Sequence, residues 1–180
     1  MSTQRRNIEN SCIYHIYNRS IDNRVIFESK NDFGWFLDRI LYYRDKYNIK
    51  IIAFALLPTH YHLVLQEPTS GVGIVKFISC LQNSYAKHFN YLRGRKGNLF
   101  ESRYNSKFVY DDYYLLILIK YVNYNSVKHG LVSKVNKWDF SSYFDYNTGV
   151  GDLVDIGYIH KYRYSYEKVS IKVIDDHPWG

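Results

Sequence analysis

The sequence predicts an α+β fold in which helices pack on an antiparallel sheet. Segments of strand-like composition and amphipathic helical segments follow one another in the order strand, helix, strand, strand, helix, strand, helix. Only Pro58-Thr59 separates the second strand from the third, so these two strands must pair antiparallel. The first six elements match the ferredoxin-like, or RRM-like, order, and the seventh is an additional C-terminal helix.

The first half of the chain supplies three of these elements. Residues 12–17 are rich in strand formers and lead into a turn-rich basic loop. Apolar residues at helical spacing predict a helix from Asn31 to Tyr47, with Asn31 as its N-cap. Residues 49–57 are apolar on both faces, which predicts a buried, central strand.

The second half supplies the rest. Residues 60–66 read as the antiparallel partner strand, and residues 72–93 as a second amphipathic helix. Residues 98–110 alternate between apolar and polar side chains, which predicts a strand with one wet, largely basic face. Asp111 or Asp112 caps a third helix, which ends near residue 129 before Gly130. A weak pattern over 152–166 predicts one more short helix.

Length and composition limit the number of domains and the classes of partner that the chain can have. The 180 residues suit one domain, which we place at 1–180, with a core of about 10–145 and a weakly patterned tail at 146–180. A net charge of +7 and 20 tyrosines favour a nucleic-acid partner. Cys12 and Cys80 form no disulfide framework, which fits a reducing cytoplasm. The chain has neither a membrane-length apolar run nor a signal-peptide core, so we expect no membrane partner.

His60 and His62 follow the most apolar segment of the chain. Alternation along a strand puts both imidazoles on one face, about 7 Å apart, where they can bind one metal ion. The alternative is a pair of partly exposed histidines at a strand start. Zinc hydrolases with an H-x-H-x-D-H pattern are excluded, because Leu, Val, Leu and Gln follow here.

The third predicted helix carries Tyr121 and Asn125, which are four residues apart and therefore share one helix face. They lie on the flank of its apolar stripe. An ordinary amphipathic edge would look the same, and Tyr124 is an alternative exposed tyrosine near that face.

Five motifs occur in order between about residues 12 and 145: Y-H-I-Y-N-R, A-L-L-P-T-H-Y-H-L-V-L, G-N-L-F-E-S-R-Y-N-S, Y-V-N-Y-N-S-V-K-H-G-L-V and W-D-F-S-S-Y. With them the chain resembles the single-tyrosine HUH transposases of small insertion sequences, especially the REP-associated tyrosine transposases. The chain departs from many relatives in having Asn125-Ser126 where they have Asn-Pro.

The resemblance implies metal-dependent cleavage of single-stranded or hairpin DNA and strand transfer, as in DNA transposition. Tyr121 would be the nucleophile and would form a 5′-phosphotyrosine intermediate. His60, His62 and Asn125 would hold Mg²⁺ or Mn²⁺, and a nearby cation would favour the phenolate of Tyr121. Relatives act as monomers or as homodimers, so we expect one of these two states.

Basic residues from several loops and strands are the candidates for contact with DNA phosphates. They are Arg19, Arg24, Arg93, Arg95, Lys96, Arg103 and Lys107. His15 lies either near the site or in ordinary packing, and His129 has no partner pattern. Two other functions stay open: a non-catalytic nucleic-acid-binding protein on the same scaffold, and a metal-dependent hydrolase in which the tyrosine is incidental.

Overall fold

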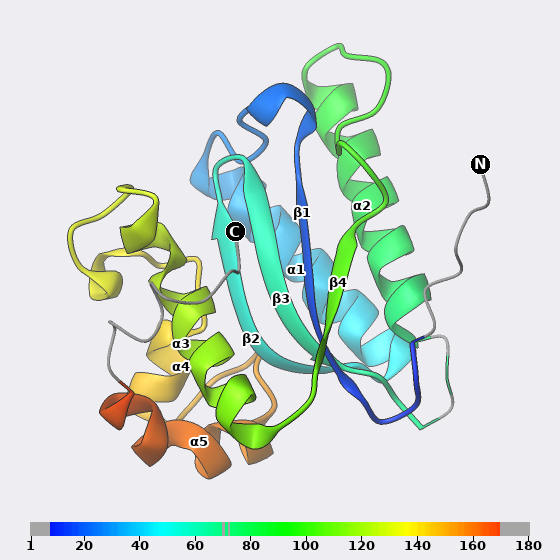
Figure 1. Cartoon of the computed structure of the whole chain (residues 1–180). Helices are drawn as coiled ribbons and strands as arrows, with labels where there is room; N and C mark the ends of the chain where they lie inside the picture. The colour runs from blue at the N-terminus through cyan, green and yellow to red at the C-terminus, as the bar shows by residue number, and fades with distance from the viewer. Residues whose placement is uncertain (1–7, 70, 72, 170–180) are drawn as a thin grey trace.

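The computed structural model describes residues 8–69, 71 and 73–169, which build a four-stranded antiparallel sheet with helices on both faces (Figure 1). The strand order is β2-β3-β1-β4, and the α+β class and ferredoxin-like order are therefore confirmed. The strands are β1 (Ile13–Arg19), β2 (Lys50–Leu57), β3 (His60–Gln66) and β4 (Asn105–Val109). The α-helices are α1 (Lys30–Tyr47), α2 (Gly73–Leu92), α3 (Asp112–Lys128), α4 (Tyr143–Thr148) and α5 (Ile156–Lys168), and two short 3₁₀ turns are η1 (Ile21–Asn23) and η2 (Val135–Lys137).

The two faces of the sheet carry different helices. Helices α1 and α2 cover one face, and α3 with α4 and α5 lies on the other side of the molecule, next to β2 (Figure 1). Side-chain alternation along β3 separates neighbouring residues between these faces. Tyr61 is fully buried toward α1 and α2, where its hydroxyl accepts a hydrogen bond from Gln82 Nε2 at 2.7 Å. His62 consequently points toward α3.

Strand β2 is not central, contrary to the sequence-based expectation, because it stands at one end of the strand order. It is nevertheless buried, because a later segment covers its outer edge. Leu56 N donates to Phe140 O at 2.9 Å, Ser142 N donates to Phe54 O at 2.9 Å, and Trp138 Nε1 donates to Leu56 O at 3.0 Å. With helices on its faces and this segment on its edge, the strand has no wet side and needs no polar positions.

Two element boundaries differ from the prediction, and one short helix was not expected. The N-cap of α1 is Ser29, not Asn31, and a reciprocal pair of hydrogen bonds with Asp32 forms a capping box. Strand β4 covers only Asn105–Val109, because the preceding residues turn away after an isolated bridge between Ser20 and Phe100. Helix α4 was not predicted.

Other boundaries agree with the sequence. Asp111 caps α3 through its side chain, which accepts a hydrogen bond from Tyr114 N at 2.6 Å. Gly130 follows α3 with a φ of +67°, a left-handed conformation that glycine adopts without strain. Among the helices in the described part of the chain, none has the length and apolar character needed to cross a bilayer.

Candidate active site

Strand β3 aims His60 and His62 at the sheet face beside α3. In the register, His62 lies between Ala55 of β2 and Tyr17 of β1, and His60 lies opposite Arg19. His62 is 5% exposed, and its ring centroid is 5.3 Å from that of His60. The predicted pair therefore shares one face, at the end of the sheet where β3 begins.

A second polar atom holds each imidazole in place. Thr59 Oγ1 is 2.9 Å from His60 Nδ1, and His15 Nε2 is 2.9 Å from His62 Nδ1. Both contacts use Nδ1, so Nε2 of each ring is the nitrogen that remains for a ligand. His15 is fully buried and contacts His62, so of the two places that the sequence left open it lies near the candidate site.

Burial keeps these imidazoles neutral at pH 7. It lowers the pKa of His15 to about 3 and that of His60 to about 4, and it holds the pKa of His62 well below its ordinary value. Neighbouring His129 also lowers the pKa of His60. Neutral rings keep a lone pair, as a metal ligand or a hydrogen-bond acceptor must.

Acid is expected to destabilise the fold through these histidines. An unfolded histidine has a pKa near 6.5, so the unfolded chain binds protons below that pH while His15, with a pKa of about 3, stays neutral when folded. The stability is thus present above about pH 6.5 and is lost as the pH falls toward 3. His15 alone accounts for a loss of about 2 kcal/mol between pH 7 and pH 5. Urea unfolding at both pH values measures it, and His15→Gln should lose less; an equal loss would contradict the assignment.

Helix α3 places Tyr121 and Asn125 over the histidines. Tyr121 is 3% exposed, and its ring stands edge-on at 5.9 Å from His62 and 6.3 Å from His15. Burial raises the pKa of Tyr121, the Asn125 amide acts in the opposite direction, and Tyr17 raises it further. Without a bound cation, the protein therefore favours the protonated phenol of Tyr121 over the phenolate.

Asn125 is fully buried, yet neither of its amide atoms has a hydrogen bond of good geometry within the described chain. The amide lies close enough to His60 and Tyr121 to affect the pKa of both. An unsatisfied buried amide costs roughly 1–3 kcal/mol, so such a residue is unusual without a function.

Two more side chains of the α3 end reach the site and were not predicted. The His129 ring lies 4.7 Å from that of His60, and Lys128 Nζ lies 5.1 Å from the Tyr121 ring centroid. Both residues follow Asn125 by about one helical turn and Tyr121 by about two turns, and this spacing was the available signal. Tyr124 is elsewhere: Lys120 Nζ lies 5.4 Å from its ring, on the side of α3 that faces α5.

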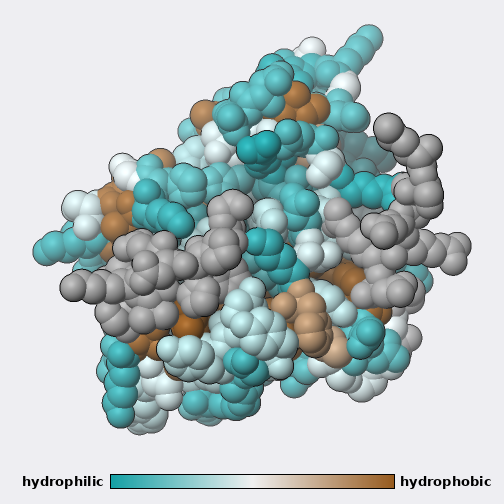
Figure 2. Space-filling model, in the orientation of Figure 1, coloured by the Kyte–Doolittle hydropathy of each residue, from teal (hydrophilic) through white to brown (hydrophobic). Residues whose placement is uncertain are grey.

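The end of the sheet that holds the histidines is also where basic loops meet. Ser20 N donates to Thr59 O at 2.9 Å and Ile21 N donates to Leu99 O at 3.1 Å, so three loops are tied together there. Figure 2 shows mostly hydrophilic residues over this end of the molecule. Arg24, Lys96 and Arg103 are exposed, and contact of these residues with DNA stays a prediction.

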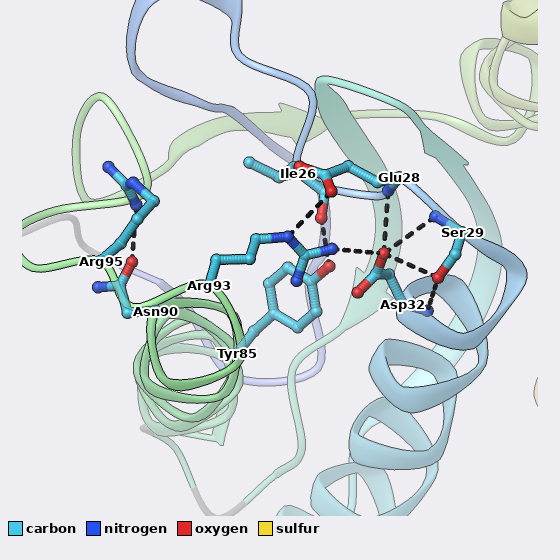
Figure 3. Close-up of polar contacts among 8 residues, drawn as sticks. All are labelled: Ile26, Glu28, Ser29, Asp32, Tyr85, Asn90, Arg93 and Arg95. Carbon is cyan, nitrogen blue, oxygen red and sulfur yellow. Dashed lines mark hydrogen bonds and ion pairs between the residues drawn. The ribbon is translucent and has the colours of Figure 1, made fainter.

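The other four predicted DNA-binding residues have partners in the protein. Arg93 is 21% exposed and pairs with Glu28 at 3.0 Å and with Asp32 at 2.9 Å, which joins the end of α2 to the start of α1 (Figure 3). Arg95 donates to Asn90 Oδ1 at 2.6 Å, and Arg19 pairs with Glu101. Lys107 Nζ lies 5.8 Å from the ring of Tyr17. The pairing of Arg93 gives it a structural role that the sequence did not indicate.

The residues present fit a divalent cation. Within residues 8–69, 71 and 73–169, no group of three or more His, Cys, Asp or Glu side chains is placed to hold a metal ion. His60, His62 and Asn125 form a mixed set instead, with two available ring nitrogens and one unsatisfied amide oxygen. Neutral imidazole and amide oxygen are both ligands of divalent metals.

Comparison with known proteins finds a curated relative and a solved structure with the same fold. A curated protein of Haemophilus influenzae named as a REP-associated tyrosine transposase is 27% identical over 108 residues, which are 55% of this chain and 61% of the relative. The chain thus spans about 61% of that protein's length. A solved REP-associated tyrosine transposase, bound to a REP hairpin, has the same fold, with a TM-score of 0.68 over 86% of this chain and 94% of that one, at 22% identity.

A family sequence profile gives the broader match. The profile described as "Transposase IS200 like" covers residues 9–125, more than half of the chain, and that range includes all four of the predicted catalytic and metal-ligating residues. The chain therefore belongs to the IS200-like transposase family.

Proposed function

We propose that this protein cleaves single-stranded, hairpin-bearing DNA and transfers the cleaved strand, with Tyr121 as the nucleophile. The observation that carries the proposal is a convergence of side chains. Tyr121 and the unsatisfied amide of Asn125 come from α3, and they meet two neutral imidazoles from β3. A protein that only bound nucleic acid would have no use for this set of groups.

The proposed reaction is a balanced transesterification. Tyr121 Oη attacks the phosphorus of a phosphodiester, a new oxygen–phosphorus bond forms, and the bond to the 3′-oxygen breaks. The phenol loses one proton and the leaving 3′-oxygen gains one. Because the phosphotyrosine keeps the energy of the broken link, the 3′-OH of another strand can reverse the reaction. Such reversibility serves strand transfer.

The chain's own groups have separate roles. His60, His62 and Asn125 would hold a divalent ion, Mg²⁺ or Mn²⁺, which would offset the charge of the non-bridging phosphate oxygens. Burial of Tyr121 keeps water from competing with the phenol, and Lys128 brings positive charge close to the ring. In one chain Tyr121 already lies beside His62, so we infer that the nucleophile acts within its own protomer, whether the protein is a monomer or a homodimer.

His15 is expected to control metal affinity through His62. If Nε2 of His62 binds the metal, Nδ1 carries the proton and donates it to His15 Nε2. His15→Gln keeps an acceptor oxygen, whereas His15→Leu removes it and should weaken Mn²⁺ binding by roughly 10- to 100-fold. Calorimetric titration of DNA-free protein with Mn²⁺ measures this, and equal affinities of the two variants would contradict it.

The hairpin is proposed as substrate because the solved relative with the same fold is bound to one. Exposed basic residues at the histidine end of the sheet, together with the net charge of +7, support a polyanionic ligand. We treat residues 1–180 as one catalytic domain. Target sequence would be read by base contacts that the charge pattern does not define.

The direct test is to trap and locate the adduct. The protein is incubated with Mn²⁺ and 3′-labelled hairpin oligonucleotides, with single-stranded flanks, copied from the DNA around its gene. A labelled band that migrates with the protein on a denaturing gel is expected, and peptide mass spectrometry should place the nucleotide on Tyr121. Specific hairpin binding without any adduct would favour the non-catalytic alternative, and cleavage without an adduct would favour the hydrolase.

A further inference from the structure

One half of the sheet face that carries the histidines has no helix over it in the described part of the chain. Helix α3 lies against β2 and β3, while β1 and β4 continue beyond it (Figure 1). The register places Tyr17 beside His62 on one side and beside Asn105 of β4 on the other. The proposed active site therefore borders an extended surface formed by two strands.

Tyr17 stands at that border. Its ring is nearly parallel to the His62 ring, at 5.8 Å and 25°, and it lies 4.9 Å from the His15 ring. The side chain is half-buried, and Tyr17 is close enough to Tyr121 to raise the pKa of that phenol. Tyr17 is thus held by the histidines while part of it remains accessible, and nothing in the proposed reaction uses it.

The surroundings of Tyr17 suit a single nucleic-acid strand. Lys107 Nζ lies 5.8 Å from the Tyr17 ring centroid, and Arg19 follows two residues later on β1. Proteins hold single strands by combining cations for the phosphates with aromatic rings on which bases stack. A rigid ring with a cation beside it, next to the nucleophile, provides both contacts within reach of one nucleotide.

We infer that Tyr17 is a binding residue on which the nucleobase adjacent to the scissile phosphate stacks, with Lys107 contacting the backbone of the same strand. This inference rests on the proposed function, because it takes Tyr121 as the reacting group. Stacking against Tyr17 would hold the strand at the site, so that the phosphate lies in front of the phenol rather than sliding past it. This stacking contact, which we call the base platform, is distinct from the contacts that the exposed basic loops are proposed to make with the hairpin.

The test is a double-mutant cycle in which a substitution at Tyr17 is combined with removal of a single base from the DNA. Tyr17→Phe keeps the ring, Tyr17→Leu removes it at similar apolar character, and Tyr110→Leu is the matched control, because Tyr110 is a 65% exposed tyrosine just beyond β4. Each protein is incubated with the hairpin oligonucleotide whose cleavage site the adduct experiment has located. Two altered oligonucleotides are also used, one lacking the base on the 5′ side of the scissile phosphate and the other lacking the base on its 3′ side. Tyr17→Leu should slow adduct formation roughly 10-fold on the intact DNA and have little further effect on one abasic copy. Tyr17→Phe and Tyr110→Leu should stay within about 2-fold of the wild type.

A second readout follows the base directly. With 2-aminopurine at the stacked position, binding to Tyr121→Phe protein should quench its fluorescence, and the added Tyr17→Leu change should restore it. The inference would be wrong if Tyr17→Leu slowed adduct formation equally on the intact DNA and on both abasic DNAs. It would also be wrong if Tyr17→Phe slowed adduct formation as much as Tyr17→Leu does. An adduct formed by the wild type in those cases leaves the proposed function standing, whereas no adduct with any hairpin overturns both. Circular dichroism confirms that each variant is folded.

Discussion

Tyr121→Phe is expected to abolish the covalent protein–DNA adduct and to reduce cleavage by at least about 1,000-fold, as loss of an enzymatic nucleophile does. The substitution removes one hydroxyl and keeps the buried ring, so the packing against His15 and His62 persists. Hairpin affinity should therefore stay within about 2-fold of the wild type. The measurements are a denaturing gel for the adduct and a binding titration for the affinity.

Tyr124→Phe is the matched control, because Tyr124 lies on the α5 side of the same helix. It should form the adduct at the wild-type rate. An adduct that survives in Tyr121→Phe but not in Tyr124→Phe would move the nucleophile and refute the site. Mixing Tyr121→Phe with His62→Ala protein tests the arrangement within one protomer: no activity should return, and restored activity would show that the nucleophile serves a partner's histidines.

Asn125→Leu is expected to remove activity while making the protein more stable. Leucine has nearly the shape of asparagine, and it relieves the cost of two buried amide atoms without good hydrogen bonds. The free energy of unfolding, measured with urea in the presence of EDTA, should rise by about 1 kcal/mol. Adduct formation should fall by at least about 100-fold, because the third proposed ligand is lost.

Ser126→Ala provides the comparison for this result. Ser126 is the next residue on α3, it is equally buried, and its Oγ also has no partner in the described chain. Its substitution should leave stability unchanged or slightly improved and should leave adduct formation intact. If Asn125→Leu keeps full activity, Asn125 is an ordinary packing residue and the proposed ligand set is wrong.

Local patterns predicted the elements that carry the site. Alternation along a strand places His60 and His62 on one face of the sheet. The four-residue spacing of Tyr121 and Asn125 likewise places them on one face of a helix. Both rules depend only on backbone geometry. His15 could not be assigned from the sequence, since strand register decides whether it meets His62. His129 was missed for a related reason: its contact with His60 depends on how far α3 extends over the sheet.

Packing between distant segments explains the error on β2, whereas the error at the start of α1 concerns a local capping box that a distant residue reinforces. An apolar run on both faces indicates burial, but it does not say whether another strand or a loop covers the edge; β2 is covered by residues near Phe140. The start of α1 shifted from Asn31 to Ser29 because Asp32 completes a capping box there, and Arg93 from α2 pairs with the same carboxylate (Figure 3). A short sequence window contains no information about Arg93.

The division of the site between β3 and α3 has a consequence during protein synthesis. His62 leaves the ribosome about 60 residues before Tyr121, which corresponds to several seconds of translation. The segment that seals β2 emerges later still. During that interval the nascent chain holds the histidines without the proposed nucleophile, so it could not yet form the proposed phosphotyrosine. Under the proposed function, reactivity toward phosphodiesters would thus arise only after α3 has been made and has packed beside β3.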